Sequence, residues 1–222
     1  LKIKTVENFL NSQSKYDRVV YNFGNSSFHS HMFHLLESIP GIVILHDFFL
    51  SGIQAHREVH ELHQAVWAKE LLKSHGYMAC HERYSATDTA DVVWKYPVNL
   101  SVLERAKALI VHSKHSVELA VKWYGQSLGE SFDIIPLLRA APQKKDRNLI
   151  RKRLGFKKDD LVVCSFGGLG KSKLNHSLID AWLESPLALN KNCYLIYVGS
   201  DDNGEYCESI KYKIKNSPLN KN

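Results

Sequence analysis

Residues 161–184 read LVVCSFGGLGKSKLNHSLIDAWLE, and this stretch decides the class of fold. Its first six residues form a continuous apolar run, which is the pattern of a strand buried in a parallel sheet. Glycines at positions 167, 168 and 170 mark a turn. Apolar residues then recur at helical spacing over 174–184. A strand, a glycine-rich turn and a helix in this order predict one unit of a parallel α/β domain.

The same alternation continues on both sides of this unit. Short apolar runs predict strands, and apolar residues three to four apart predict helices. We expect further strands at 17–23, 42–45, 108–111, 132–135 and 193–198, and further helices at 28–38, 51–75, 114–124 and 205–216. Strands separated by helices in this way predict an α/β protein whose parallel sheets are covered by helices on both faces.

A basic segment, residues 139–158, separates the two runs of elements. It holds nine Lys and Arg residues and one acidic residue, whereas the whole chain has a net charge of +6. We expect the boundary between two domains here. The segment is interpreted either as a solvated linker or as a surface for an anionic partner such as a membrane. Nucleic acid is not expected as a partner, because the charge is confined to one segment.

The composition is that of a folded protein. Hydrophobic residues make up 44% and charged residues 23% of the 222 residues, which excludes an intrinsically disordered chain. The apolar runs fall far short of the roughly 18 residues that a membrane span requires. The four cysteines form no C-x-x-C pair, which fits a reducing compartment. We expect a cytoplasmic protein, and the basic segment would allow peripheral contact with the inner face of the membrane.

Polar side chains follow several of the expected strands. Ligands of open parallel sheets bind beyond the carboxyl ends of the strands, so these side chains are candidates for a binding site. His46 directly follows a buried strand, where an imidazole can bind a polar ligand or act as a base. A histidine satisfied within the core is the structural alternative. The other candidates on this edge are Asn22, Asn25, His29, Asp47 and Ser113.

The loop at 167–173 carries a second candidate site. Gly167 and Gly168 allow a backbone to approach a phosphate, while the following helix N-terminus, Lys171 and Lys173 supply positive charge. A plain turn is the structural alternative. Gly170-Lys171-Ser172 also matches the end of a P-loop, but Ser165 stands where that motif has its first glycine. An ATPase or kinase therefore stays open as an interpretation.

The chain contains 12 histidines, and five of them raise the question of a metal site, namely His29, His31, His56, His60 and His63. His56 and His60 are spaced to share a helix face, with His63 close by. Arg57 follows His56, however, where the zinc motif H-E-x-x-H requires glutamate. We therefore expect no metal site.

Seven stretches follow one another in an order that is typical of one enzyme family. They are residues 21–29 (YNFGNSSFH), 43–50 (VILHDFFL), 105–113 (RAKALIVHS), 134–136 (IIP), 154–155 (LG), 165–173 (SFGGLGKSK) and 194–199 (YLIYVG). In that order they resemble the family-4 glycosyltransferases, and the first three resemble the motifs of a bacterial subgroup. The resemblance extends over roughly residues 17 to 216, and it rests on the shared order of the stretches.

The resemblance implies a GT-B fold, in which two Rossmann-like domains face each other across a cleft. It implies an acceptor-side domain over 1–138 that lacks its first strand and loop, a basic linker over 139–158, and a partial donor-nucleotide-binding domain over 159–222. The chain is thus expected to be a piece of a longer protein, incomplete at both ends. By the same resemblance, His46 would lie near the donor sugar and Lys173 would contact the donor diphosphate.

One departure from the family affects the donor loop. The arginine of the family's loop falls on Gly168, so that contact is absent or supplied elsewhere, and Lys171 is a candidate substitute. The remaining assignments follow the same resemblance. Catalytic roles would fall to His46 and Lys173, donor binding to Gly167, Gly168, Lys171 and Lys173, and the acceptor-side cleft to Asn22, Asn25, His29, Asp47 and Ser113.

The function that these expectations imply is transfer of a sugar from a nucleotide diphosphate-sugar to a hydroxyl of a glycan or lipid-linked glycan. The family resemblance implies retention of anomeric configuration, no obligatory metal, and no cofactor besides the nucleotide-sugar substrate. Two alternatives stay open. One is a non-catalytic nucleotide- or carbohydrate-binding fragment of the same fold, since the chain would lack parts needed for activity. The other is a P-loop-like ATPase or kinase that uses Gly170-Lys171-Ser172.

Overall fold

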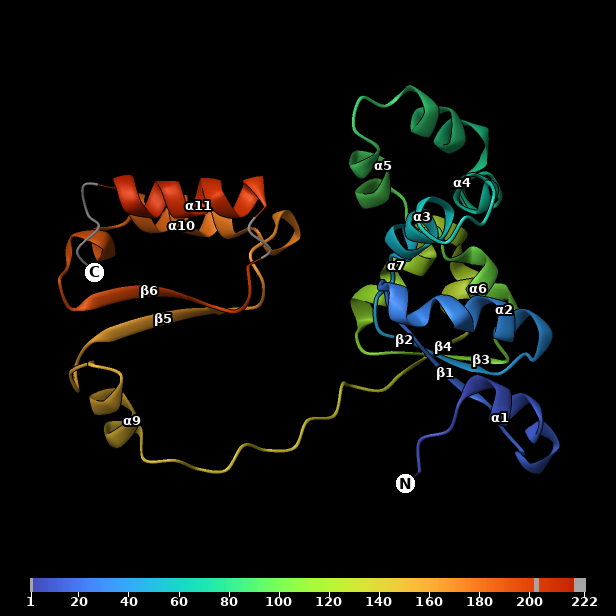
Figure 1. The fold of residues 1–222 in the computed structure, drawn as a ribbon, viewed down its shortest axis with the longest axis horizontal. Helices are drawn as coiled ribbons and strands as arrows, with labels where there is room; N and C mark the ends of the chain where they lie inside the picture. The colour runs from blue at the N-terminus through green and yellow to red at the C-terminus, as the bar shows by residue number, and fades with distance from the viewer. Residues whose placement is uncertain (1, 202–203, 218–222) are drawn as a thin grey trace. The chain divides into compact units, whose positions relative to one another are not determined.

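The computed structural model describes residues 2–201 and 204–217. The chain divides into two compact units, which are Leu1–Ala140 (unit 1) and Ala141–Asn222 (unit 2). Each unit has its own parallel sheet (Figure 1). The α/β class with Rossmann-like parallel sheets, expected from the sequence, is confirmed.

Unit 1 is built on a parallel sheet of four strands. The strands are β1 (Val20–Phe23), β2 (Ile42–Leu45), β3 (Ala108–Val111) and β4 (Phe132–Ile134), and they lie in the order β1-β2-β3-β4. The predicted bounds of the second and third strands are confirmed to the residue. The first strand starts three residues later than the prediction of 17–23.

Unit 1 also contains α-helices, and short 3-10 helices labelled η. The α-helices are α1 (Val6–Leu10), α2 (Ser30–Ser38), α3 (Ser51–Val59), α4 (Val66–Ser85), α5 (Thr89–Lys95), α6 (Leu100–Arg105), α7 (Lys114–Tyr124) and α8 (Gln126–Gly129). The 3-10 helices are η1 (Gln13–Lys15) and η2 (Ser27–His29). The prediction of a helix at 114–124 is confirmed, whereas α1, α5, α6 and α8 were not expected.

The helices that connect the strands of this sheet lie on one of its faces, whereas we expected helices on both faces. Each strand is followed in sequence by its neighbour in the sheet, and the sheet grows in one direction only. Because crossovers between parallel strands are right-handed, this order leaves all connecting helices on one face (Figure 1). Burial alternates accordingly along the strands. Val43 and Leu45 of β2 are fully buried, whereas Ile42 and Ile44 are only partly buried.

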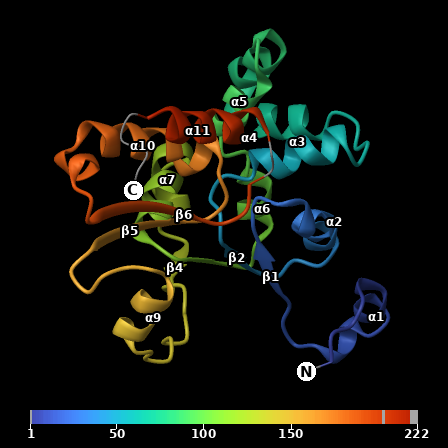
Figure 2. The ribbon, with the colours of Figure 1, turned by 60° about the vertical axis from the view of Figure 1, so that its left-hand side comes forward.

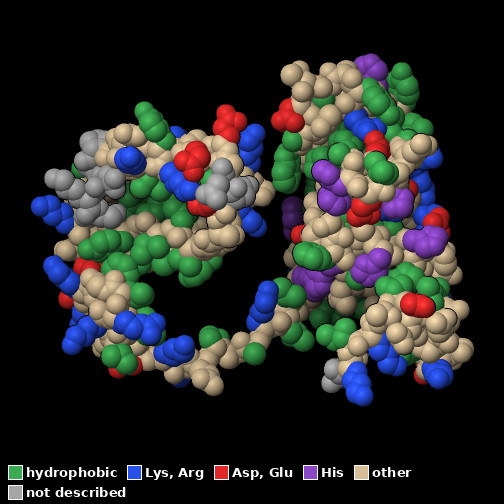
Figure 3. Space-filling model, in the orientation of Figure 1, with side chains coloured by type: hydrophobic (Ala, Val, Ile, Leu, Met, Phe, Trp, Pro, Cys, Tyr) green, Lys and Arg blue, Asp and Glu red, His purple; other side chains and the backbone are tan. Residues whose placement is uncertain are grey.

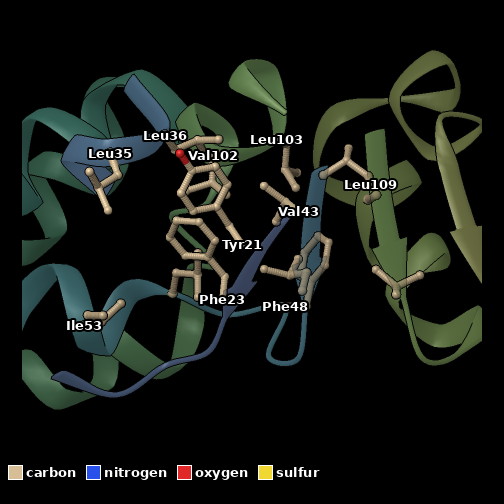
Figure 4. Close-up of a cluster of buried hydrophobic side chains, with 14 residues drawn as sticks. Tyr21, Phe23, Leu35, Leu36, Val43, Phe48, Ile53, Val102, Leu103 and Leu109 are labelled. Atoms are coloured by element: carbon tan, nitrogen blue, oxygen red, sulfur yellow. The ribbon is translucent and has the colours of Figure 1, made fainter. Parts of the chain in front are cut away.

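The core of unit 1 lies between the covered face and the helices. Phe23 and Val43 from the strands meet Leu36 of α2 and Ile53 of α3, all at 1% exposure or less (Figure 4). Phe23 also meets the ring of Phe33 edge to face, with 5.1 Å between ring centroids. Burial of side chains of this size contributes about 1.5–3 kcal/mol each, so this face fixes the register of the sheet.

The helix predicted at 51–75 is two helices, α3 and α4, with a break at 60–65. The reason lies in Glu58, whose carboxylate accepts hydrogen bonds from the backbone N–H groups of Trp67 (2.9 Å) and Ala68 (3.3 Å). It thereby caps the start of α4, as an N-terminal acidic group should. Leu62 and Ala65 adopt positive φ angles in the connection.

Unit 2 contains two parallel strands, β5 (Leu161–Phe166) and β6 (Cys193–Val198), paired in register over their whole length. Both strand predictions are confirmed. The helices α10 (Asn175–Glu184) and α11 (Glu205–Asn216) lie on the same side of this pair (Figure 2), again in contrast to the expected coverage of both faces. Short 3-10 helices η3 (Lys171–Lys173) and η4 (Pro186–Leu189) complete the unit.

The segment predicted as a linker, 139–158, contains a short helix, α9 (Arg147–Arg153). Asp146 caps it by accepting hydrogen bonds from the N–H groups of Asn148 and Leu149. Arg151 donates to the carbonyl oxygen of Lys157 at 3.0 Å and to that of Asp160. At least one of the nine basic residues therefore has a structural role. Across the described residues, no helix is both long and apolar enough to cross a bilayer.

Candidate functional site

A pair of contacting histidines lies at the carboxyl edge of the unit 1 sheet. His46 directly follows β2, and His112 directly follows β3. Their ring centroids are 4.9 Å apart, and His112 Nε2 lies 2.9 Å from His46 Nδ1. The strand register explains the pairing, because Ile44 lies opposite Ile110 and each histidine stands two positions further on. Asn22 of β1 places Oδ1 3.3 Å from His46 Nε2.

A second group of predicted residues surrounds the loop after β1. Asp47 Oδ2 accepts a hydrogen bond from the N–H of Asn25 at 2.8 Å. A Cβ atom at Gly24 would lie 2.9 Å from His29 Nε2 and 3.2 Å from Asp47 Oδ2. Both side chains thus pack over this glycine, where a side chain would keep them apart. The structure therefore brings Asn25, His29 and Asp47 together next to His46.

Asn25 has a structural role within this group. Its Oδ1 accepts a hydrogen bond from the N–H of Ile53, in the first turn of α3, at 2.8 Å. A Cβ at Gly52 would lie 2.9 Å from Asn25 Nδ2, so the amide packs directly against the helix start. Such an oxygen satisfies a helix N–H group that has no partner within the helix. The predicted acceptor-side residue thus caps a helix from the loop after β1.

The surroundings of His46 favour its neutral form. Partial burial lowers its pKa, the neighbouring His112 lowers it further, and the carboxylate of Asp47 opposes both effects. The usual pKa of histidine is near 6.5, so a lowered value leaves the ring uncharged at neutral pH. A neutral ring has one N–H donor and one bare nitrogen acceptor.

Ser113 stands directly after His112, at the start of α7. It is the N-cap residue of α7, and its Oγ lies 3.5 Å from Ser116 Oγ in the first helical turn. The residue that contacts His46 is its neighbour, His112, which sequence reasoning missed. Strand alternation could have found it, because Leu109 and Val111 point into the core and His112 continues the opposite face.

A buried polar contact holds the segment that follows the pair. The amide nitrogen of Asn99 donates to the carbonyl oxygen of Phe48, and its Oδ1 accepts from the hydroxyl of Tyr124. Leu50 N–H donates to the carbonyl oxygen of Pro97 at 2.7 Å. These bonds fix the chain directly after His46 and Asp47, so the carboxyl edge is held from behind by α6 and α7.

The loop after β5 in unit 2 holds the predicted donor-binding residues. Gly167 has a φ of 125°, which an L side chain rarely adopts. Lys173 folds over it, with Cε 3.9 Å from where a Cβ of Gly167 would stand. A Cβ atom at Gly168 would lie 3.3 Å from the carbonyl oxygen of Ser200, so the loop packs closely against that residue. Lys171 is exposed at the start of η3.

Several backbone N–H groups of this loop already have partners within the unit. Gly167 N–H donates to the carbonyl oxygen of Val198 at 2.9 Å, and Leu169 N–H to that of Ser200 at 3.2 Å. Gly170 N–H donates to Asn175 Oδ1 at 2.9 Å. These bonds fix the shape of the loop and reduce the number of donors that face outward.

The N-terminus of α10 is also partly occupied. The N–H of His176 donates to the hydroxyl oxygen of Tyr206 at 3.1 Å. The same hydroxyl oxygen lies 2.9 Å from His176 Nδ1, within hydrogen-bond distance. Tyr206 was not predicted as a partner of this helix. The expectation that a free helix N-terminus faces the loop therefore holds only for the remaining N–H groups.

Within residues 2–201 and 204–217, no group of three or more His, Cys, Asp or Glu side chains is placed to hold a metal ion. Histidine side chains do gather on one face of unit 1 (Figure 3). The rings of His56 and His60 are tilted to each other with centroids 4.7 Å apart, and His56 Nε2 lies 3.8 Å from Glu61 Oε1. This group is a surface network of rings and one carboxylate.

No known protein family matches the chain, and no curated protein matches its sequence.

Proposed function

We propose that the chain is part of a glycosyltransferase that moves a sugar from a nucleotide diphosphate-sugar to a hydroxyl of a glycan or lipid-linked glycan. The observation that carries the proposal is the loop after β5, where Lys173 folds over a left-handed glycine between a parallel strand and a helix. A lysine and a helix start at the carboxyl end of a strand suit a diphosphate.

The two units would supply different parts of the chemistry. In unit 2, Lys173 would neutralise charge that develops on the departing diphosphate, which is a main source of rate enhancement in such reactions. In unit 1, neutral His46 would contact the sugar, with Asn22 beside it. The same proposal includes the GT-B class of fold, in which unit 1 is the acceptor-side domain and unit 2 the start of the donor domain. Retention of configuration without a metal belongs to this proposal too.

The basic segment 139–158 supports a lipid-linked acceptor or a peripheral site at the inner face of a membrane. Lys144, Lys145 and Lys152 are exposed there. Each basic residue close to an anionic bilayer contributes about 1 kcal/mol of attraction. A solvated linker explains the same residues equally well, so binding to vesicles that contain anionic lipid is the measurement that separates the two.

The P-loop alternative receives less support from the geometry. In a P-loop, consecutive backbone N–H groups surround the phosphates. Here the N–H groups of Gly167, Leu169 and Gly170 donate to atoms of the protein. A phosphate cradle would require these bonds to break. The non-catalytic binding fragment differs from our proposal only in turnover, and experiment distinguishes them.

The test is donor binding by the variant Lys173→Ala, measured by calorimetric titration with a panel of nucleotide diphosphate-sugars. Loss of one hydrogen bond to a charged group costs about 1.5–3 kcal/mol, and the exposure of Lys173 favours the lower end, so we expect about tenfold weaker binding. The matched control is Lys191→Ala, a lysine that precedes β6 at the opposite edge of the strand pair. It should bind the donor like the unchanged protein.

The outcomes distinguish the glycosyltransferase from the non-catalytic fragment and from the P-loop enzyme. Equal donor affinity of the Lys173 variant and the unchanged protein would remove the basis for the donor site. Donor binding without release of nucleotide diphosphate in the presence of lipid-linked or glycan acceptors would favour the non-catalytic fragment. Magnesium-dependent ATP hydrolysis that disappears in Lys171→Ala would favour the P-loop enzyme instead.

A further inference from the structure

His112 of the histidine pair contacts a backbone carbonyl group, and this contact determines which ring nitrogens carry protons. His112 Nδ1 is 2.8 Å from the carbonyl oxygen of Ile135. A carbonyl oxygen can only accept a hydrogen bond, so Nδ1 of His112 must carry a proton. The oxygen itself is held in place, because the N–H of Ile135 continues the sheet by donating to the carbonyl oxygen of Val111 at 2.9 Å.

The second step follows from the chemistry of a neutral imidazole. A neutral ring carries one proton, so in the state in which both rings are neutral, His112, with a protonated Nδ1, has a bare Nε2. That bare nitrogen lies 2.9 Å from His46 Nδ1, a distance at which one of the two nitrogens must donate. The proton of the contact therefore belongs to His46 Nδ1. Neutral His46 then has no proton left for its Nε2.

We propose that His112 is a positioning residue that fixes the proton of neutral His46 on Nδ1, so that Nε2 is a hydrogen-bond acceptor at the carboxyl edge of the unit 1 sheet. An acceptor nitrogen pairs with a group that donates, such as a ligand hydroxyl, and not with a phosphate oxygen. This selects a polyol or sugar hydroxyl as the group that His46 binds. The identity of that ligand rests on the proposed function, whereas the proton position does not.

The electrostatic surroundings of His46 fit a neutral ring, whereas the side-chain amide of Asn22 has to be turned over for this arrangement. Partial burial and His112 keep the pKa of His46 low, whereas Asp47 acts in the other direction and His29 adds a smaller lowering. Asn22 Oδ1 lies 3.3 Å from His46 Nε2, and two acceptors cannot share a hydrogen bond, so a bare Nε2 requires the Asn22 amide to be turned over. The amide nitrogen and oxygen of asparagine are nearly equal in size, and turning the amide over lets Nδ2 donate to the bare Nε2.

The experiment is a long-range proton–nitrogen NMR correlation of the histidine rings in the unliganded protein, at a pH where the spectrum shows both His46 and His112 to be neutral. The His46 signals are assigned by their loss in His46→Gln. An unrestrained histidine in water prefers the Nε2–H form, so the proposal predicts the less common Nδ1–H form for His46. In His112→Phe, which keeps a ring but removes the acceptor, His46 should change to mainly the Nε2–H form.

A second variant guards against a folding defect. His112→Gln keeps an amide oxygen that can accept from His46 Nδ1, so it should retain the Nδ1–H form. Observation of the Nε2–H form in the unchanged protein would overturn the proposal, even if His112→Phe did not fold. An unchanged His46 tautomer in a folded His112→Phe variant would overturn it as well. None of these measurements uses a donor sugar, so failure of the proposed function in the calorimetric test would be a separate result.

Discussion

Replacement of Asn99 by alanine tests how the carboxyl edge of unit 1 is held in place. Asn99 is 1% exposed and lies directly before α6. It joins two parts of the chain, because it donates to the carbonyl oxygen of Phe48 and accepts from the hydroxyl of Tyr124. Phe48 stands two residues after His46. The substitution Asn99→Ala removes both hydrogen bonds at once.

The size of the effect follows from the two partners that are left behind. The Phe48 carbonyl oxygen and the Tyr124 hydroxyl would each lose a hydrogen bond inside the protein. A buried polar group without a partner costs about 1–3 kcal/mol, so the free energy of unfolding of unit 1 should fall by about 2–6 kcal/mol. Domains are stable by about 5–15 kcal/mol in total, so this is a large fraction.

Urea denaturation followed by tryptophan fluorescence measures this loss in the background Trp182→Phe. Trp182 is the tryptophan of unit 2, and the three others, at positions 67, 94 and 123, lie in unit 1. The fluorescence then reports on unit 1. The matched variant is Tyr124→Phe, which leaves only Asn99 Oδ1 without its partner and should cost about half as much.

A loss below about 1 kcal/mol for Asn99→Ala would refute this reasoning, since even one unsatisfied buried group should cost that much. A loss for Tyr124→Phe equal to that for Asn99→Ala would also contradict it, because the bond to Phe48 would then contribute nothing. If Asn99→Ala does not fold at all, Tyr124→Phe still measures one of the two bonds.

Two further predictions concern a partly buried histidine and a close approach of the backbone. His75 Nε2 accepts from the N–H of Val98 at 3.1 Å, and burial lowers its pKa to about 4. The unfolded chain, with a pKa near 6.5, binds more protons between these values, so stability should fall by up to about 3 kcal/mol as the pH drops from 6.5 to 4. Urea denaturation at several pH values should show this slope, and His75→Gln should flatten it. In unit 2, a Cβ at Gly199 would collide with the carbonyl group of Gly167, whereas one at Gly170 would meet nothing within 4 Å. Gly199→Ala should therefore lower the urea midpoint followed through Trp182 by the equivalent of about 1–3 kcal/mol, and Gly170→Ala should leave it nearly unchanged.

The strands could be predicted well from the sequence because each is a short apolar run between turn residues. The runs at 42–45, 108–111, 161–166 and 193–198 form strands with those bounds. Coverage of the sheets could not be predicted in the same way. It depends on the spatial order of the strands, and a run of apolar residues carries no information about its neighbours. The order β1-β2-β3-β4 leaves one face of the unit 1 sheet without connecting helices.

The break between α3 and α4 shows a second limit of sequence reasoning. Apolar residues continue at helical spacing through 51–75, and this periodicity predicts one helix. The break depends on a tertiary capping interaction, in which Glu58 reaches forward to the N–H group of Trp67. Arg83, from the end of α4, pairs with the same carboxylate and lies over the Trp67 ring at 4.6 Å. Contacts of this kind join positions that local pattern does not relate.

The candidate site could be predicted from the sequence only in part. The rule that ligands bind beyond the carboxyl ends of parallel strands placed Asn22 and His46 on the correct edge, because it uses only the ends of strands that were themselves predictable. The rule does not distinguish between adjacent residues. After β3 it left His112 and Ser113 as candidates, and Ser113 was selected. Alternation decides that choice. Position 112 continues the face opposite to buried Leu109 and Val111, and the register then sets it beside His46. A strand-end rule combined with alternation and register would therefore have predicted the pair. The carbonyl group of Ile135, which orients His112, could not have been predicted in this way. It follows β4, and only the folded sheet brings it next to His112.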